Sequence, residues 1–474
     1  MFAHVRPRLV ALHCAFHQTY HLRGGGGDSP REREELLHGA CIATMQAMSI
    51  SRSLTQFAHP QNTWHACARA QVLALAMAQH PRLGVESLAG KLPIDCLMRI
   101  FEKLLAPPVV LDVGTRVCKA GFAGESSPRT LFRTVVGLSK VQPLMPDVDK
   151  DFFVGNEALR KRGILRLNFP VEHGIVVNWD RLEDVWRHAF LDLGVVSGAS
   201  HPLMLSEAPL NPRPNRERMV QLAFDTFGAP AVYLCLTSTL ALRSTNRTTG
   251  VVVSSGESVT HVVPVYEGYA LPHAIQRLDV AGRDLTSLLC KMMTERGYSF
   301  TSNSNLDLVR DIKEELMYAA LDYAEELRRS EDELESTYEL PNGPSISLDR
   351  ERFRCAEALF HPEVIGHQPI GIHQMVFKAI MSCDDAIRPR LYGGVVLSGG
   401  NAMIPGLSSR MVKELTMLAP VGTEIQVVVP SRRADHATWM GGSSLASLPA
   451  FQSMWLTRRE YDRIGPSAIH QKCP

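Results

Sequence analysis

The sequence contains no run of about 18 apolar residues, so it predicts no membrane-spanning helix. Its net charge is only +1 at pH 7, which gives no reason to expect nucleic acid or an anionic membrane as the main partner. The short apolar stretch from Leu9 to Phe16 is interrupted by His13 and Cys14, and it lacks the longer core of a secretory signal. None of the 10 cysteines forms a CxxC pair, which favours reduced thiols over a disulfide framework or a zinc site. These absences favour an intracellular protein of several folding units.

The composition changes at the prolines 107 and 108, which divide the chain into residues 1–107 and residues 108–474. The first segment carries a run of four glycines and scattered histidines, and its apolar residues sustain no long period. We expect an N-terminal extension of mostly irregular structure with short helices, for instance Cys67 to Met77. The second segment alternates predicted strands and helices to its end, which is typical of an α/β fold.

One short piece of the extension has a recognisable pattern. Leu92 to Leu104 resembles the opening helix of an F-box, a module that docks to ubiquitin-ligase adaptors. The remaining helices of such a module have no room before residue 108, so we favour an amphipathic lead-in helix. Translation that begins at Met98 is a further alternative, which would leave the upstream residues outside the functional protein.

Three strands that end in glycine turns point to a nucleotide. Val109 to Thr115 is an apolar run with a tight turn, followed by a return strand, and Val251 to Ser258 repeats that shape about 140 residues later. We expect a duplicated α/β domain whose two turns face each other across a cleft, because such turns present backbone N–H groups to anions. Val395 to Asn401 adds a buried strand that ends in a glycine pair before a predicted helix, a junction that suits a nucleotide.

A long helix is predicted from Leu308 onward. Its apolar residues recur at steps of three and four and form one stripe, made of Val309, Ile312, Leu316, Ala320, Tyr323 and Leu327. The charged residues off this stripe predict a solvated face, and they are Arg310, Lys313, Glu314 and Glu315.

Several longer motifs identify the second segment. Residues 108–474 resemble actin over nearly its full length, and the motifs that carry the resemblance are Cys118–Gly124, Lys161–Leu165, Glu172–Val176, Asn178–Asp180, Glu207–Pro212, Tyr266–Ile275, Thr294–Phe300, Glu351–Cys355 and Trp439–Ser443. The resemblance implies a two-lobed fold of four subdomains with ATP or ADP and Mg²⁺ or Ca²⁺ in a central cleft. Actins also form filaments whose slow ATPase sets their turnover.

The resemblance assigns site residues position by position. The implied nucleotide-binding residues are Asp112, Gly114, Thr115, Lys119, Gly256, Glu257, Gly282, Lys313, Glu314, Gly399, Gly400 and Met403. Within this set Lys119 corresponds to the lysine that reaches the phosphates, and Lys313 and Glu314 to base and ribose contacts. Asp112 is the one candidate metal ligand, and His261 is a retained position linked to hydrolysis.

Other positions depart from the family pattern. Arg116 replaces a turn glycine, which is strained if its φ is positive and otherwise leaves the side chain near the phosphates or in solvent. Ser254 replaces the aspartate that holds the metal and orients water, and Thr237 replaces the glutamine that positions the attacking water. Ser258 replaces another turn glycine. Near the adenine, Asp435 or His436 stands in place of a lysine.

Surfaces that join subunits in actin filaments are changed as well. The loop from Leu138 to Asp151 carries prolines and aspartates that disfavour the usual docking conformation. In the groove that binds partner helices, Arg243, Ser244 and Asn246 are altered, whereas Leu445, Leu448 and Met454 remain apolar. Neutral surface drift is the alternative explanation. We expect actin-binding or cytoskeletal partners with reduced self-association, and a location in the cytoplasm and cytoskeleton, with the nucleus open.

These substitutions predict a divergent actin-like interaction protein that binds nucleotide weakly and does not hydrolyse it usefully. The alternative is an ATP-binding, filament-forming actin with slow ATPase activity whose substitutions are compensated. A variant of the first hypothesis lets Arg116 replace the charge of the metal, so that nucleotide binds without it. A sugar kinase or heat-shock-type ATPase on the same superfold is disfavoured by the long actin-like motifs.

Overall fold

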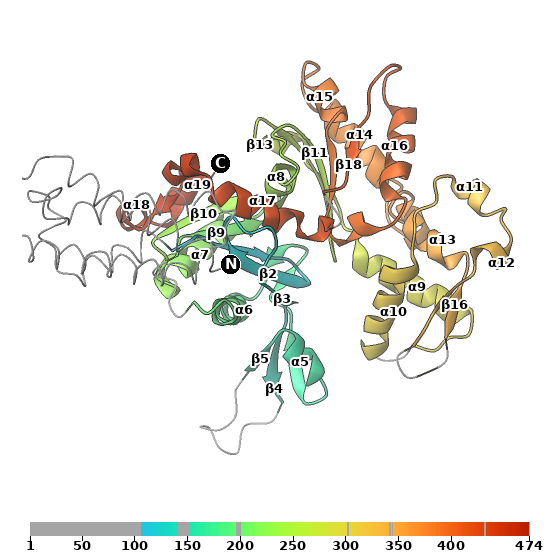
Figure 1. Ribbon diagram of the computed structural model, residues 1–474, viewed down its shortest axis with the longest axis horizontal. Coiled ribbons are helices and arrows are strands. Elements are labelled where there is room, and N and C mark those ends of the chain that lie inside the picture. The colour runs from blue at the N-terminus through green and yellow to red at the C-terminus, as the bar shows by residue number, and fades with distance from the viewer. Residues whose placement is uncertain are drawn as a thin grey trace, which may run out of the picture. The chain divides into compact units, whose positions relative to one another are not determined.

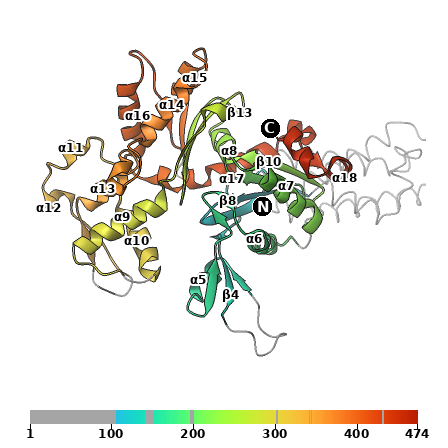
Figure 2. The same cartoon turned by 180° about the vertical axis from the view of Figure 1, so that it is seen from behind.

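The computed structural model describes residues 106–140, 152–195, 201–300, 303–340, 343, 345–430 and 433–473. A six-stranded mixed sheet forms the centre of the first half (Figures 1 and 2). Its order is β19 (Leu456–Thr457), β10 (Ala231–Leu236), β9 (Leu203–Glu207), β1 (Val109–Val113), β2 (Val117–Phe122) and β3 (Thr130–Arg133). Strands β1, β9 and β10 are parallel, and β2 runs antiparallel to β1. Their apolar runs fit strands buried on both faces.

The second half repeats this arrangement. Its sheet has the order β13 (Tyr269–Ala270), β12 (Thr260–Tyr266), β11 (Gly250–Ser255), β17 (Val395–Ser398) and β18 (Val427–Val428), and β14 (Gln276–Leu278) pairs with β12. Here β11 and β12 form the antiparallel hairpin, and β17 and β18 continue in parallel. The predicted duplication is therefore confirmed in the strand order and in the directions of the strands.

A smaller group of elements is inserted into each half. The first insertion is a three-stranded sheet of β5 (Phe152–Val154), β4 (Val136–Ser139) and β6 (Leu165–Asn168), followed by the pair β7 (Val171–Glu172) and β8 (Ile175–Val176). The second is mainly helical and carries the pair β15 (Ser336–Tyr338) and β16 (Ile346–Leu348). Two sheets and two insertions agree with the expected four subdomains.

Helices cover the sheets and join the halves. Those of the first half are α5 (Asn156–Arg160), α6 (Trp179–Asp192), α7 (Arg213–Gln221), α8 (Thr237–Arg243), α17 (Ala437–Ala446), α18 (Arg458–Ile464) and α19 (Ile469–Lys472). Those of the second half are α9 (Gly282–Glu295), α10 (Asn303–Leu316), α11 (Tyr323–Glu326), α12 (Glu331–Leu334), α13 (Glu351–Glu357), α14 (Ile372–Met381), α15 (Arg388–Tyr392) and α16 (Leu407–Leu418). The chain passes between the halves after α8 and again before α17.

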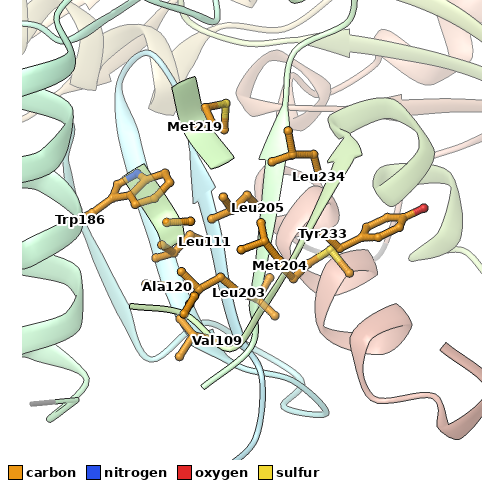
Figure 3. Packing of buried hydrophobic residues seen from close by; sticks show 14 of the residues in the cluster. Val109, Leu111, Ala120, Trp186, Leu203, Met204, Leu205, Met219, Tyr233 and Leu234 are labelled. Atoms are coloured by element: carbon orange, nitrogen blue, oxygen red, sulfur yellow. The ribbon is translucent and has the colours of Figure 1, made fainter. Parts of the chain in front are cut away.

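Each half has its own hydrophobic core. In the first, Trp186 of α6 packs with strand residues such as Leu111 and Leu205 (Figure 3). Helices α8 and α17 pack against each other where the halves join. Their backbones approach so closely that a Cβ on Gly441 would lie 1.8 Å from the carbonyl oxygen of Leu240, so this crossing requires glycine.

The long helix predicted from Leu308 to Leu327 is wrong in its second half. Helix α10 ends at Leu316, and α11 begins only at Tyr323. The N–H groups of Tyr318 and Ala319 donate to carbonyls of other segments, Arg352 and Pro405, instead of continuing the helix. The spacing of apolar residues alone cannot predict that carbonyls of other segments will take these backbone N–H groups from the helix.

Some predictions lie outside the described residues. They include the extension up to residue 105, with its two candidate helices, and residues 141–151 of the predicted contact loop. Within the described part of the chain, no helix is long and apolar enough to cross a membrane. The six cysteines there are free thiols, in agreement with the expectation of reduced cysteines.

Candidate functional site

A cleft of about 600 Å³ lies between the two hairpins β1–β2 and β11–β12. This volume is in the range of small-molecule sites, about 300–1,000 Å³. All twelve residues predicted to bind nucleotide line it, together with His261, Thr237 and Ser254. The structure therefore brings into one cavity residues that are up to about 290 positions apart in the chain, the distance from Asp112 to Met403.

The β1–β2 hairpin supplies a charged pair to the cleft. The Lys119 ammonium donates to the Asp112 carboxylate at 3.0 Å, and the Ser206 hydroxyl donates to its other oxygen at 2.6 Å. Asp112 is buried, so these partners hold its charge in a fixed position. Sequence reasoning missed Ser206, although it is a polar residue near the C-terminal end of a buried strand, where parallel sheets place their sites.

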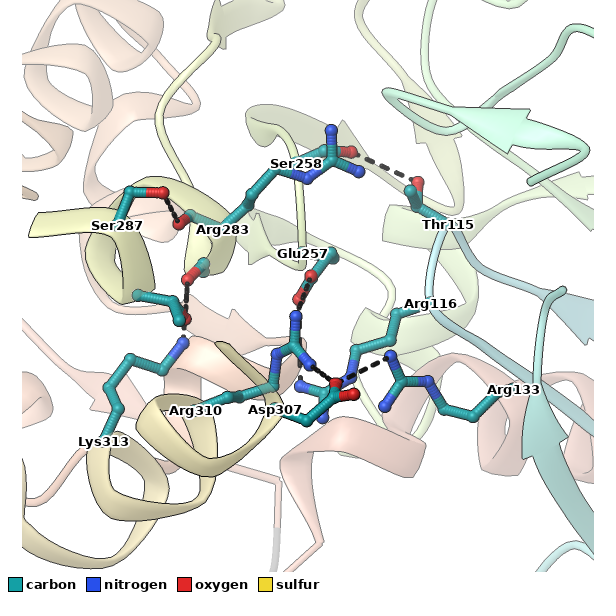
Figure 4. Close-up of polar contacts among 12 residues, drawn as sticks. Thr115, Arg116, Arg133, Glu257, Ser258, Arg283, Ser287, Asp307, Arg310 and Lys313 are labelled. Atoms are coloured by element: carbon teal, nitrogen blue, oxygen red, sulfur yellow. Dashed lines mark hydrogen bonds and ion pairs between the residues drawn. The ribbon is translucent and has the colours of Figure 1, made fainter. Parts of the chain in front are cut away.

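The two turns face each other, as predicted. The Ser258 hydroxyl of the second turn donates to the Thr115 hydroxyl of the first at 3.3 Å (Figure 4). The backbone N–H of Gly174 also donates to the Thr115 hydroxyl, at 3.1 Å. Neither Ser258 nor Arg116 has a positive φ, although both replace turn glycines of the family pattern. The strain considered for Arg116 is therefore absent.

Arg116 crosses the cleft instead of pointing to solvent. It donates to the Glu314 carboxylate at 2.7 Å, and its guanidinium also lies 3.8 Å from Glu257. Arg310 holds Glu257 at 3.2 Å and Asp307 at 2.6 Å, and Arg133 reaches to within 4.0 Å of Asp307 (Figure 4). Burial and the nearby guanidinium groups of Arg116 and Arg310 lower the pKa of Arg133 to about 10.

The solvated face predicted for the helix around residue 310 is partly wrong. The Lys313 ammonium is buried and donates to the carbonyl of Gly282 at 2.8 Å, and burial lowers its pKa. Arg310 is also largely covered, with a side chain that is only 11% exposed. Glu314 and Glu315 are exposed as expected. The stripe argument missed this because a second face of α10 lines the cleft, where ionic partners are available.

Glycine is required where β17 meets the second hairpin. Gly399 has a φ of 89°, and a Cβ there would lie 2.3 Å from the carbonyl oxygen of Ser255. Gly400 has open space around it. The predicted strand-to-helix junction is only partly correct, because a 3₁₀ turn (Gly400–Met403) follows β17 and α16 starts at Leu407. The Asn401 amide, missed from the sequence, ties this turn to Ser255 and Gly256.

His261 lies on the wall of the cleft opposite Ser254 in the register of the hairpin. Burial, with a smaller effect of the Arg277 charge, lowers its pKa to about 4, so the ring is neutral at pH 7. Its Nε2 atom has no hydrogen-bond partner among the described residues. A neutral buried imidazole with a free ring nitrogen can hold a water but cannot act as a general acid at neutral pH.

The residues do not fit a divalent cation well. Both oxygens of Asp112 are engaged by Lys119 and Ser206, and both oxygens of Glu257 face guanidinium groups. Within the described ranges, no group of three or more His, Cys, Asp or Glu residues is arranged to hold a metal. Hard cations need several oxygen ligands, and a serine at position 254 contributes no charge to such a set.

The cleft nevertheless has the parts that a nucleotide needs. Two opposed glycine turns, a lysine at the first turn and a buried lysine beside Gly282 surround one cavity.

A comparison with protein families gives one further finding. The family model described as Actin matches residues 104–474.

Proposed function

We propose, from the premise that this chain belongs to the actin family, that its fold serves as a scaffold for partner proteins and that its cleft binds adenine nucleotide weakly without useful hydrolysis. Members of the family bind ATP or ADP with a divalent cation. Residues 108–474 form the actin-like part in this proposal, and residues 1–107 form an extension. The proposed nucleotide contacts are the twelve predicted residues, all of which are among those that line the cleft.

The observation that carries the proposal is the pairing of Ser254 with His261 in the second hairpin. At this point Ser254 places a hydroxyl where the family pattern has a carboxylate, and it lies opposite the retained, neutral imidazole of His261. Thr237, which begins α8 on the same cleft, is too short to position water as a glutamine would. One positioned polar group is worth about 2.7–4 kcal/mol in a transition state. Losing both groups should remove most of an already slow ATPase.

The direct test is phosphate release from ATP by the full chain with Mg²⁺, beside a conventional filament actin. We expect a rate at least about 100-fold lower, because one lost group alone accounts for 10²–10³. The double variant Thr237→Gln, Ser254→Asp should regain part of it, and Ser287→Ala, on the exposed side of α9 outside the cleft, serves as a control that leaves both positions unchanged. A wild-type rate equal to that of the conventional actin, with normal Mg²⁺ dependence, contradicts the proposal.

A functioning ATP-dependent filament former is the second candidate. It is supported by the complete lining of the cleft, in which every predicted nucleotide contact is present. Sedimentation of the full chain with MgATP separates the candidates. A pelleted fraction that grows with MgATP and releases phosphate favours the filament former, and protein that stays in the supernatant favours the scaffold.

The proposed partners are actin-binding or other cytoskeletal proteins, with the cytoplasm and cytoskeleton as the location and the nucleus open. Support comes from the end of the first half, where Leu445 and Leu448 are half-buried and Met454 is 38% exposed. Arg243 and Ser244, at the end of α8, are half-buried, and Asn246 is exposed. Such a mixed set of apolar and polar side chains favours partner helices different from those that bind actin. Binding of an actin-groove helix peptide, measured by fluorescence anisotropy, tests the difference.

A further inference from the structure

We propose that Arg116 is an internal ligand of the cleft, whose guanidinium competes with the ribose of a nucleotide for the carboxylates of Glu257 and Glu314. This inference rests on the proposed weak nucleotide binding and gives it a cause within the chain. Arg116 is then a residue that lowers the affinity of the cleft for nucleosides and nucleotides alike.

The resemblance to actin implies Glu314 as a ribose contact and Glu257 as a nucleotide contact, and these are two of the five carboxylates that line the cleft. A ribose diol is best bound by carboxylate oxygens. Asp112 is held by Lys119 and Ser206, and Glu207 is buried and held by Arg216. Glu257 is paired with Arg310 through its Oε1 atom at 3.2 Å, which leaves its Oε2 atom and the Glu314 carboxylate as the candidate acceptors. Asp435 is the fifth carboxylate, and its oxygens lie 3.5 Å from Arg433 and 3.3 Å from His436.

Arg116 occupies these two carboxylates. Its guanidinium donates to Glu314 at 2.7 Å and lies 3.8 Å from Glu257. Arg116 comes from the first half and both carboxylates from the second, so this pairing bridges the cleft. Figure 4 shows Arg116 beside Glu257. A nucleoside that uses the same oxygens must first displace the guanidinium.

The local structure places Arg116 there without strain. The carbonyl of Arg116 accepts from the N–H of Thr134 at 2.9 Å, and its φ is not positive. Its side chain is 21% exposed and that of Glu257 is 11% exposed, so the contact is partly shielded from water. If Arg116 is removed, Glu257 keeps Arg310 as a partner and Arg133 loses a repulsive neighbour. We therefore expect an Arg116 variant to fold.

Two possible roles of Arg116 predict opposite changes in ligand affinity when the residue is removed. As a competitor for ribose, Arg116 weakens binding, and its removal strengthens it. As a cation that replaces the metal beside the phosphates, it would strengthen binding, and its removal would weaken it. Adenosine separates these roles further, because it has the ribose but carries no phosphate charge.

The experiment titrates adenosine and ADP, each with EDTA, into the full-length wild type and the variants Arg116→Ala and Arg116→Met, by calorimetry. The methionine variant keeps an apolar stem of similar length. We expect both variants to bind adenosine about tenfold more tightly, since a hydrogen bond to a charged group is worth about 1.5–3 kcal/mol. Arg283→Ala is the control, because Arg283 is exposed on α9 near the second turn and does not line the cleft. It should leave adenosine affinity unchanged.

A second measurement compares the salt dependence of adenosine binding in the wild type and in Arg116→Ala. Salt screens exposed ion pairs, and the Glu314 side chain is 56% exposed. Because adenosine is uncharged, raising the salt concentration should increase its affinity for the wild type and leave that of Arg116→Ala unchanged. Equal or weaker adenosine binding by the folded Arg116 variants overturns the inference, and so does adenosine affinity that is independent of salt. These outcomes differ from failure of the proposed function, which would show as tight MgATP binding and rapid phosphate release by the wild type.

Discussion

The two hairpins that meet across the cleft have the same backbone and different chemistry. Each closes with a hydrogen bond from a turn glycine to the return strand, from Gly114 to Val117 at 3.1 Å and from Gly256 to Val259 at 3.2 Å. The residues that face each other just before the turns differ between the two hairpins. In the first hairpin they are the ion pair of Asp112 and Lys119, and in the second they are Ser254 and His261.

The turn residues differ in the same way. Counting from each glycine, Thr115 corresponds to Glu257, and Arg116 corresponds to Ser258. The first turn thus places a cation, and the second an anion, at the mouth of one cleft. The two halves therefore repeat the backbone of the hairpin and its turn. The side chains on each turn decide whether it binds a metal, binds a phosphate or contacts the opposite turn.

The largest expected effect comes from breaking the ion pair of the first hairpin. Lys119→Met leaves the buried Asp112 carboxylate with Ser206 as its one remaining partner among these contacts, and it should destabilise the protein by about 3–5 kcal/mol. Ser254→Ala, the matched change in the second hairpin, should cost less than about 1 kcal/mol. Thermal unfolding of both variants measures the difference. Equal losses would mean that the two hairpins do not differ in this way.

The second prediction concerns acid. The folded pKa of His261 is about 4, below its ordinary value of 6.5, so between these values the unfolded chain binds a proton that the folded one does not. Stability from this group is complete above pH 6.5 and falls as the pH drops towards 4, by up to about 3 kcal/mol.

The pKa values of other buried histidines are lowered as well, so the contribution of His261 is measured by comparing a variant with the wild type. His261→Gln should unfold with a shallower dependence on pH than the wild type between pH 6.5 and 4, in thermal scans at each pH. Parallel curves for wild type and variant would contradict the assignment to His261.

A third change makes the second hairpin more like the first. Ser254→Asp places a carboxylate opposite His261 and should raise the pKa of that histidine, with proton affinity increased roughly tenfold or more. NMR titration of the histidine ring follows this directly. Ser254→Asn has a similar shape without the charge and should leave the pKa low. The same result for both variants would exclude an electrostatic cause.

The smallest expected effect concerns the contact between the turns. Ser258→Ala removes the hydroxyl that donates to Thr115, which should cost about 0.5–1.5 kcal/mol of stability. Ser287→Ala, which removes a hydroxyl from the solvent-facing side of α9, is the control and should cost less. Thermal unfolding compares them. A larger loss in the control would show that the turns are not held by this bond.

Much of the site was predictable from the sequence because its residues lie in short local patterns. The strand–glycine turn pattern and the resemblance to actin led to twelve predicted nucleotide contacts, and all twelve line the cleft. Arg310, Arg133 and Ser206 were missed, since each gains its role from a partner on another element. Lys313 was assigned both to a solvated face and to the nucleotide site, and the structure places it in the cleft and buries it.

The sequence by itself determined the duplicated α/β architecture and many of the residues that line the cleft. It could do so because apolar strand segments, glycine turns and long motifs are local in the chain. Tertiary structure alone decided where Arg116 points, where α10 ends and why Asp112 is unavailable to a metal. Each of these depends on a hydrogen bond or ion pair between residues far apart in sequence. Which of these distant partners forms the bond depends on the geometry and burial of the folded protein, and a local sequence pattern does not contain that information.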